Sequence, residues 1–147
     1  MRGIVADIVS DVLIKAPPGA VFRGVSTPAG LDAWWTKTSM GEPASGAEFE
    51  LGFGPGYEWR ARVTKCRPDA EFEIELLEAH PDWAGTRVGF RVEPGEKHTT
   101  LSFYHTGWPE ANDHWRTSCY CWPIYLRLLR RNLEHGEFVP FESRLDV

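Results

Sequence analysis

The sequence predicts an α+β domain in which a strongly curved antiparallel sheet packs around one long C-terminal helix, with two short helices after the first strand. Most of the chain alternates apolar and polar residues at period two, which is typical of strands with one buried face. One segment near the C-terminus instead repeats its apolar residues at steps of three and four, which is typical of a helix. Without an internal repeat or linker, residues 1–147 are expected to form a single domain.

The first strand and the two short helices follow each other directly. Residues 4–14 place Ile4, Ala6, Ile8, Val12 and Ile14 on one face, together with Ser10. Pro17-Pro18 ends this strand and suits the first turn of a helix through residues 20–22. Thr27-Pro28 repeats the pattern, with a threonine N-cap before a proline, and predicts a helix over GLDAWW.

Residues 47–105 read as a meander of strands. The alternating segments are 47–53, 57–63, 72–76, 88–92 and 99–105, and Gly-Pro turns separate several of them. Their inward rows are apolar and aromatic, whereas the outward rows carry Glu and Arg, which suits cross-strand ion pairs on a solvated face.

The final helix has a continuous apolar seam. Asn112 or Asp113 can cap its start, and Gly136 is expected to end it. Pro123 cannot donate to the carbonyl of Cys119, so we expect a kink rather than a new start, because the seam continues past it. The seam residues are Trp115, Cys119, Trp122, Leu126, Leu129 and Leu133.

Composition and charge exclude several classes of protein. The 16 basic residues are scattered among 21 acidic ones, for a net charge of −5, so we expect neither a nucleic-acid nor a membrane partner. No segment reaches the roughly 18 apolar residues of a membrane span. Three cysteines without an export signal indicate reduced thiols, and we expect a cytoplasmic protein.

Several short motifs occur in a family order. Near the start these are Ala16-Pro17, Val21-Phe22, Thr27-Pro28 and Trp34-Trp35; near the end they are HTGW at 105–108, a Trp, Tyr-Leu and Leu-Arg series at 122–130, and LEHGE at 133–137. In these motifs the sequence resembles the activator-of-heat-shock-protein-90-ATPase-like domains of the START-like (SRPBCC) superfamily. The resemblance covers essentially the whole chain.

The resemblance implies a helix-grip fold with a hydrophobic cavity between the sheet and the final helix. Members of the superfamily carry lipids, sterols or polyketides in that cavity, and some catalyse cyclisation or hydrolysis there. No catalytic motif transfers residue by residue, so the resemblance favours binding of a hydrophobic small molecule of lipid, polyketide or aromatic type.

A metal site is not supported by the sequence. The candidate ligands His105, His114, Cys119 and Cys121 lack the spacing of a zinc knuckle, and two helical cysteines at i and i+2 point about 200° apart. His80 and His98 lie in predicted turns, far from this stretch. We therefore expect no metal and no cofactor.

Catalysis has one weak candidate. His105 ends the inward row of the last strand and could act as a base, with Cys119 as a nucleophile across from it. No pair of carboxylates falls on the inward rows. A cyclase or hydrolase using His105 therefore stays an alternative to simple binding.

The inward aromatic rows predict the contacts of an apolar ligand, which His105 and Tyr57 would orient. A protein-interaction module of the co-chaperone kind is a second alternative. Trp83 and Trp108 lie in predicted loops, and as exposed aromatics they would favour a homodimer. The expected ligand-binding residues are Trp34, Trp35, Phe53, Tyr57, Trp59, Phe90, Phe103, His105, Trp115, Cys119 and Trp122.

Overall fold

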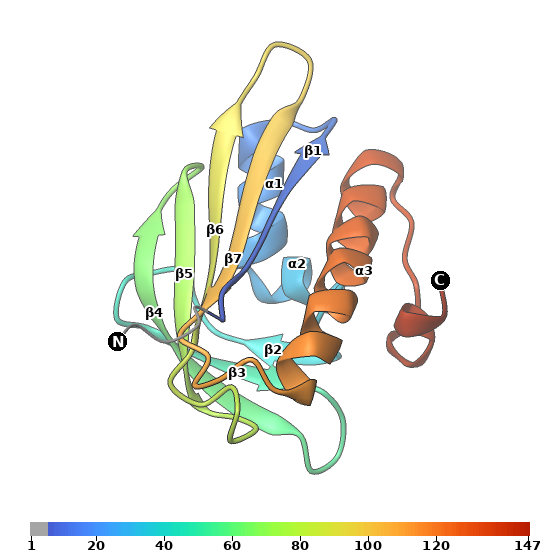
Figure 1. Cartoon of the computed structure of the whole chain (residues 1–147). Coiled ribbons are helices and arrows are strands. Elements are labelled where there is room, and N and C mark those ends of the chain that lie inside the picture. Colours follow the sequence, from blue (N-terminus) through green and yellow to red (C-terminus); the bar gives the residue numbers. More distant parts are fainter. Residues whose placement is uncertain (1–5) are drawn as a thin grey trace.

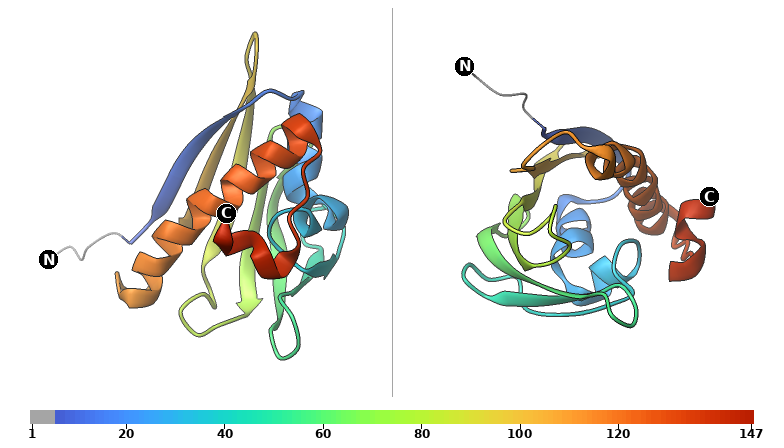
Figure 2. Two further views of the ribbon diagram at one scale, coloured as in Figure 1. Left: turned by 90° about the vertical axis from the view of Figure 1, so that its right-hand side faces the viewer. Right: turned by 60° about the horizontal axis from the view of Figure 1, so that its bottom comes forward.

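The computed structural model describes residues 6–147, and its centre is an antiparallel sheet. In this part of the chain the sheet has seven strands in the order β1-β7-β6-β5-β4-β3-β2. The sheet curves around α1 and α2, and α3 closes its open side (Figures 1 and 2). The strands are β1 (Ile8–Ile14), β2 (Thr38–Met40), β3 (Glu48–Gly52), β4 (Glu58–Arg67), β5 (Glu71–Glu78), β6 (Arg87–Pro94) and β7 (Thr99–Thr106).

The two short helices lie where the proline motifs predicted them. Helix α1 spans Pro18–Ser26 and helix α2 spans Pro28–Asp32. The Thr27 hydroxyl caps α2 by accepting a hydrogen bond from the Gly30 amide at 3.0 Å. Helix α2 is shorter than predicted, so that Trp34 and Trp35 follow its end and both side chains turn into the interior.

The long helix α3 spans Asp113–His135 without interruption. The Asn112 side chain caps it by accepting from the Trp115 amide at 2.9 Å, and Gly136 ends it in the left-handed conformation. Pro123 therefore lies inside one helix, as predicted, rather than at the start of a second one. The predicted seam packs inward, with Trp122, Leu126 and Leu129 buried against the apolar side of the sheet.

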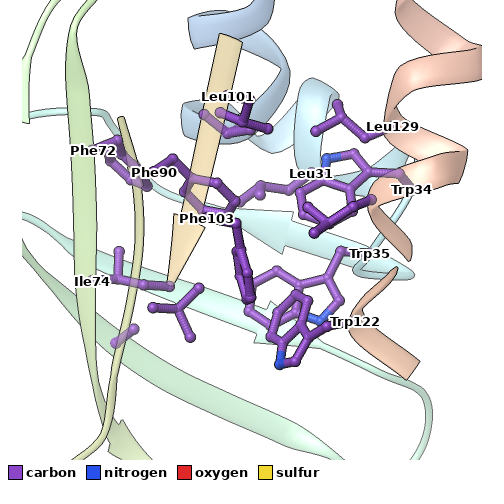
Figure 3. Packing of buried hydrophobic residues seen from close by; sticks show 14 of the residues in the cluster. Leu31, Trp34, Trp35, Phe72, Ile74, Phe90, Leu101, Phe103, Trp122 and Leu129 are labelled. Atoms are coloured by element: carbon purple, nitrogen blue, oxygen red, sulfur yellow. The ribbon is translucent and has the colours of Figure 1, made fainter. Parts of the chain in front are cut away.

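Aromatic and aliphatic side chains fill most of the space between sheet and helix (Figure 3). The rings of Phe90 and Phe103 lie 5.7 Å apart, and Phe103 lies 4.5 Å from Trp122 on α3. Trp34 meets Phe90 edge to face, and its indole N–H donates to the Gly24 carbonyl at 2.9 Å. The middle of the domain is therefore a densely packed core.

Two loop tryptophans correct the sequence prediction. Trp83 and Trp108 were expected at the surface, but they are only 8% and 7% exposed. The β5–β6 loop, which carries Trp83, folds back so that the indole lies against His105 and Trp122. A loop position does not imply an exposed side chain when the side chain is as large as tryptophan. The two indoles therefore give no support to a homodimer.

The outer face of the sheet carries the predicted Glu and Arg rows, with one exception. Arg87 and Arg91 pair with glutamates on β5, as expected for a solvated face. Glu73, however, is only 3% exposed. The Tyr104 ring crosses over Gly89 and its hydroxyl donates to the Glu73 carboxylate, which thereby loses its contact with water.

The C-terminal segment adds an element that no periodicity predicted. After α3 the chain returns beside the helix and forms the 3-10 helix η1 (Phe141–Asp146) (Figure 1). Arg144 of this segment is buried and donates to the carbonyls of Asp32, Thr36 and Val139 at 2.7–3.0 Å. Within residues 6–147 none of the helices has the length and apolar character needed to cross a bilayer.

Candidate functional site

A cavity of about 370 Å³ lies at one end of the domain, between the β3–β4 turn, the β5–β6 loop and α3. Most of its wall is aromatic, and no lysine, arginine or carboxylate lines it. The lining side chains are Trp35, Phe53, Tyr57, Trp59, Trp83, His114, Thr117, Ser118, Cys121, Trp122, Tyr125 and Phe141.

Five of these rings form a closed series of contacts, which we call the aromatic wall. Each ring lies within 6 Å of the next, and Trp83 and Trp122 stack almost parallel at 5.7 Å and 19°. The other neighbouring centroids lie 4.8–5.4 Å apart. Aromatic pairs at such distances stabilise each other, so each ring of the wall is held by two others. The members of the wall are Trp35, Phe53, Trp59, Trp83 and Trp122.

Helix α3 supplies the opposite side of the cavity. Thr117, Cys121 and Tyr125 follow each other at steps of four and therefore share one face of the helix. This face adjoins the apolar seam and carries small or polar side chains, so that the helix leaves space there. Phe141 of η1 closes the same region from the C-terminal side.

His105 was predicted to orient a ligand, but the structure places it behind the wall. The side chain is fully buried, and its ring lies 4.6 Å from the Trp83 ring. Its Nδ1 accepts from the Trp122 indole N–H at 3.2 Å, so the proton of the neutral ring is on Nε2. Nε2–H then donates to the Thr86 hydroxyl at 2.8 Å, which donates to the Trp83 carbonyl.

This arrangement keeps His105 neutral. Burial, aided by the charge of His114, lowers the pKa of the His105 imidazole to about 3. Both ring nitrogens are also engaged inside the protein. In this arrangement His105 therefore offers neither nitrogen to a ligand or a substrate, and it bonds instead to Thr86 and Trp122 beside the Trp83 ring.

The other predicted ligand contacts divide into two groups. Trp35, Phe53, Tyr57, Trp59 and Trp122 line the cavity, but Tyr57 lies in the turn before β4 and is 63% exposed rather than inward-facing. The remaining residues belong to the core or pack against it, in the sheet, on the seam of α3 or, for one tryptophan, just after α2, and they do not line the cavity. These are Trp34, Phe90, Phe103, Trp115 and Cys119.

Cys119 does not form a nucleophilic pair with His105. Burial raises the pKa of the Cys119 thiol, and burial likewise raises the pKa of the Cys121 thiol, so both favour the unreactive protonated form. Both cysteines are free. Cys121 lines the cavity as a small, weakly polar side chain.

Sequence reasoning missed several lining residues. Trp83 was assigned to a loop, His114 was considered only as a metal ligand, and Phe141 belongs to a segment without periodicity. Thr117, Ser118, Cys121 and Tyr125 could have been found from the sequence, because they occupy the helix face next to the seam.

A group of titratable side chains lies at the rim of this cavity. His114 Nδ1 lies 3.0 Å from an oxygen of the Asp82 carboxylate, and His80 Nδ1 lies 3.7 Å from the same oxygen. The sequence separation of His80 and His114 had suggested that they lie far apart. The β5–β6 loop instead brings their rings to 4.4 Å.

Two of the larger hollows also fit a ligand less well. One of about 410 Å³ lies on β2–β4 and includes Glu50, Glu58, Arg60 and Glu78 in its lining. Another of about 650 Å³ lies between α3 and the C-terminal segment and includes Arg127, Arg131 and Glu137. Neither has converging aromatic rings, so the smaller aromatic cavity is the better candidate.

The fold and the cavity define the class of protein. A curved antiparallel sheet around a long C-terminal helix is the helix-grip fold of START-like proteins. The sequence profile of the family described as "Activator of Hsp90 ATPase homolog 1-like protein" matches residues 15–134. The chain therefore belongs to this family, as its motifs predicted. No curated protein sequence matches the chain.

Solved structures share this fold. The Aha1 dimer from Colwellia psychrerythraea is 28% identical with a TM-score of 0.80, and the match covers 89% of this chain and 98% of that one. Protein MLL2253 from Mesorhizobium loti is 20% identical with a TM-score of 0.79, over 90% and 99% of the two chains. DynU16, from the dynemicin biosynthetic locus, is 21% identical with a TM-score of 0.76, over 92% of this chain and 50% of that one.

Proposed function

We propose that the protein binds a small hydrophobic molecule in the cavity between the aromatic wall and α3. The observation that carries this proposal is the cavity itself, about 370 Å³ in volume and lined by eight aromatic side chains besides His114. Ligand pockets in proteins span roughly 300–1,000 Å³, which places this one at the small end. A molecule of about two fused rings, or a short branched chain, suits that volume.

The chemistry of the lining defines the ligand further. The rings offer flat apolar surfaces, and burying them against a ligand is worth about 25 cal/mol per Å² of apolar area. The hydroxyls of Thr117, Ser118 and Tyr125 offer a few hydrogen bonds on the α3 side. An uncharged, largely aromatic ligand with one or two polar groups fits this pattern.

Binding without catalysis is the simplest function for this arrangement. The cyclase or hydrolase alternative required His105 to reach the ligand, whereas its two nitrogens bond to Trp122 and Thr86. A catalytic base must lie within hydrogen-bond reach of the proton that it removes. We propose that this binding takes place in the cytoplasm, because three free thiols favour a reducing compartment.

A fluorescence titration with N-phenyl-1-naphthylamine, an uncharged aromatic probe, tests the proposal. The probe should bind with a stoichiometry of one per chain and brighten as it leaves water. Thr117→Trp should weaken binding at least tenfold, because residue 117 is exposed at the cavity and a tryptophan there covers it. Arg116→Trp, one position away and outside the lining, is the matched control and should bind normally. Equal affinity in all three proteins would refute the site.

A homodimer is a second candidate, and it rests on the edge of the sheet. Strand β1 is an edge strand whose outward side chains Val9 and Leu13 are exposed. Exposed apolar edge strands promote pairing between chains. The Colwellia relative is described as a dimer. Sedimentation velocity at increasing concentration should show a dimer that Leu13→Lys dissociates, and a concentration-independent monomer would exclude it.

A further inference from the structure

We propose that His80, Asp82 and His114 bind one divalent transition-metal ion at the rim of the cavity, with zinc as the ion to test. The residues come from two elements: His80 and Asp82 belong to the β5–β6 loop, and His114 lies in the first turn of α3. One potential ligand atom from each residue lies within 4.8 Å of the other two. This inference does not depend on the proposed hydrophobic ligand.

Two of the three separations between ligand atoms are close to those of a tetrahedral zinc site. Two ligand atoms that are each about 2.0–2.1 Å from a tetrahedral zinc ion lie about 3.3–3.4 Å from each other. The distances from the Asp82 oxygen to Nδ1 of His114 and His80 are 3.0 and 3.7 Å, on either side of that value. Sub-ångström movements of side chains at the surface would bring both to it.

The electrostatic surroundings also favour a cation. Asp82 is partly buried, and its only charged or chargeable partners within 4.0 Å, in the part of the chain that the structure describes, are the two imidazoles. No lysine or arginine therefore neutralises this carboxylate. Two imidazoles and one carboxylate form the ligand set of many zinc sites that keep further coordination positions open.

The imidazole orientations are compatible with metal binding. His80 Nδ1 accepts the Asp82 amide N–H at 3.1 Å, so this nitrogen carries a lone pair on the side of Asp82. A metal ion would replace the amide as its partner, and the amide in this exposed loop would turn to water. The two rings stand at 73° rather than stacked, and Trp83 packs along one face of His114 at 6.1 Å, which fixes that ring.

The location gives the ion a defined relation to the cavity. His114 and Trp83 both line the cavity, so an ion held by His114 lies beside it. Three protein ligands leave at least one position of a tetrahedral ion for water or for an anionic group. A contact between the ion and a ligand in the cavity rests on the proposed function, whereas the metal site itself does not.

Isothermal titration of zinc into chelator-treated protein tests the site. We expect one ion per folded chain, and His114→Ala and Asp82→Asn should each weaken binding at least tenfold. His98→Ala is the matched control, because His98 lies at the β6–β7 turn far from the cluster in sequence and outside it in space. Circular dichroism of each variant establishes that it is folded.

Cobalt(II) gives a second readout that a nonspecific surface histidine would not. Replacement of zinc by cobalt should produce the visible absorption of a tetrahedral site, and His80→Ala should remove it. Failure to bind zinc, or equal binding by the wild type and the His114→Ala variant, would overturn the proposal. Zinc binding with no effect on the naphthylamine titration would leave the metal site intact and separate it from the ligand site.

Discussion

The buried imidazole of His105 should make the protein sensitive to acid. Its folded-state pKa is about 3, whereas a histidine in an unfolded chain titrates near 6.5. Between these values the unfolded chain binds a proton that the folded chain does not, so acidification favours unfolding. A pH of about 4.5 lies about two units below the pKa of the histidine in the unfolded chain and still above its pKa in the folded protein. Protonation of the unfolded chain therefore removes about 3 kcal/mol of stability at this pH.

Replacement of the imidazole isolates this effect. His105→Gln keeps a group that can donate to Thr86 or accept from Trp122, but it cannot titrate. We expect urea denaturation at about pH 7.5 and about pH 4.5 to show a loss of stability that is about 3 kcal/mol smaller in this variant than in the wild type.

The test compares the change in unfolding free energy between the two pH values, not the stability of the variant at one pH, since the substitution also disturbs packing. His98→Gln, at a turn outside the core, should keep the wild-type pH dependence. The same pH dependence in the wild type and His105→Gln would refute the assignment of a neutral, internally bonded His105. An NMR titration of His105 with a midpoint above about pH 5 in the folded protein would refute it as well.

Two further predictions concern stability and use urea denaturation. Arg144→Met should cost about 2–4 kcal/mol, because three partly or fully buried carbonyls lose a charged donor. Arg131→Met, which removes an exposed ion pair with Glu137, should cost far less. Equal costs would contradict the anchoring of the C-terminal segment. Gly30→Ala should destabilise the folded protein by about 1–3 kcal/mol, since its new Cβ would meet the backbone of α1, including the Gly24 Cα at 2.8 Å. Gly19→Ala is the control: its Cβ would face only flexible side chains, so it should stabilise the protein by up to about 1 kcal/mol. A Gly30→Ala variant as stable as the wild type would contradict the close approach of α1 and α2.

Local signals in the sequence were enough to predict most of the fold. Alternation identified the strands β1 and β3–β7, and the caps at Thr27, Asn112 and Gly136 set the helix ends where the structure has them. These signals are reliable because they arise from hydrogen bonds and side-chain burial within a few residues. Ile4, which was assigned to the first strand, lies outside the described residues.

Elements without a local signal were not predicted. Strand β2 has three residues and η1 depends on Arg144, which reaches carbonyls more than a hundred residues away in the sequence. Neither periodicity nor a cap reports such a long-range contact. The same limit explains why Glu73 was assigned to a solvated face, since its cover is a tyrosine on β7.

Because local patterns do not report long-range contacts, only part of the site was predicted. Inward alternation found Phe53 and Trp59, and the helix seam found Trp122. Neither pattern could tell a ring that lines a cavity from one that fills a core, such as Phe90. Trp83 and the pairing of His80 with His114 depend on how the β5–β6 loop folds back onto α3. No periodic pattern in the sequence predicts the conformation of this loop.

We expect the aromatic cavity to hold a small molecule in the cell. Native mass spectrometry of protein purified under mild conditions tests it most directly, with Thr117→Trp as the comparison. We expect a second mass species in the wild type, larger by the mass of a small organic molecule, which organic extraction removes and the Thr117→Trp protein lacks. A wild-type spectrum with only the bare chain, or an adduct that Thr117→Trp retains in full, would contradict the account.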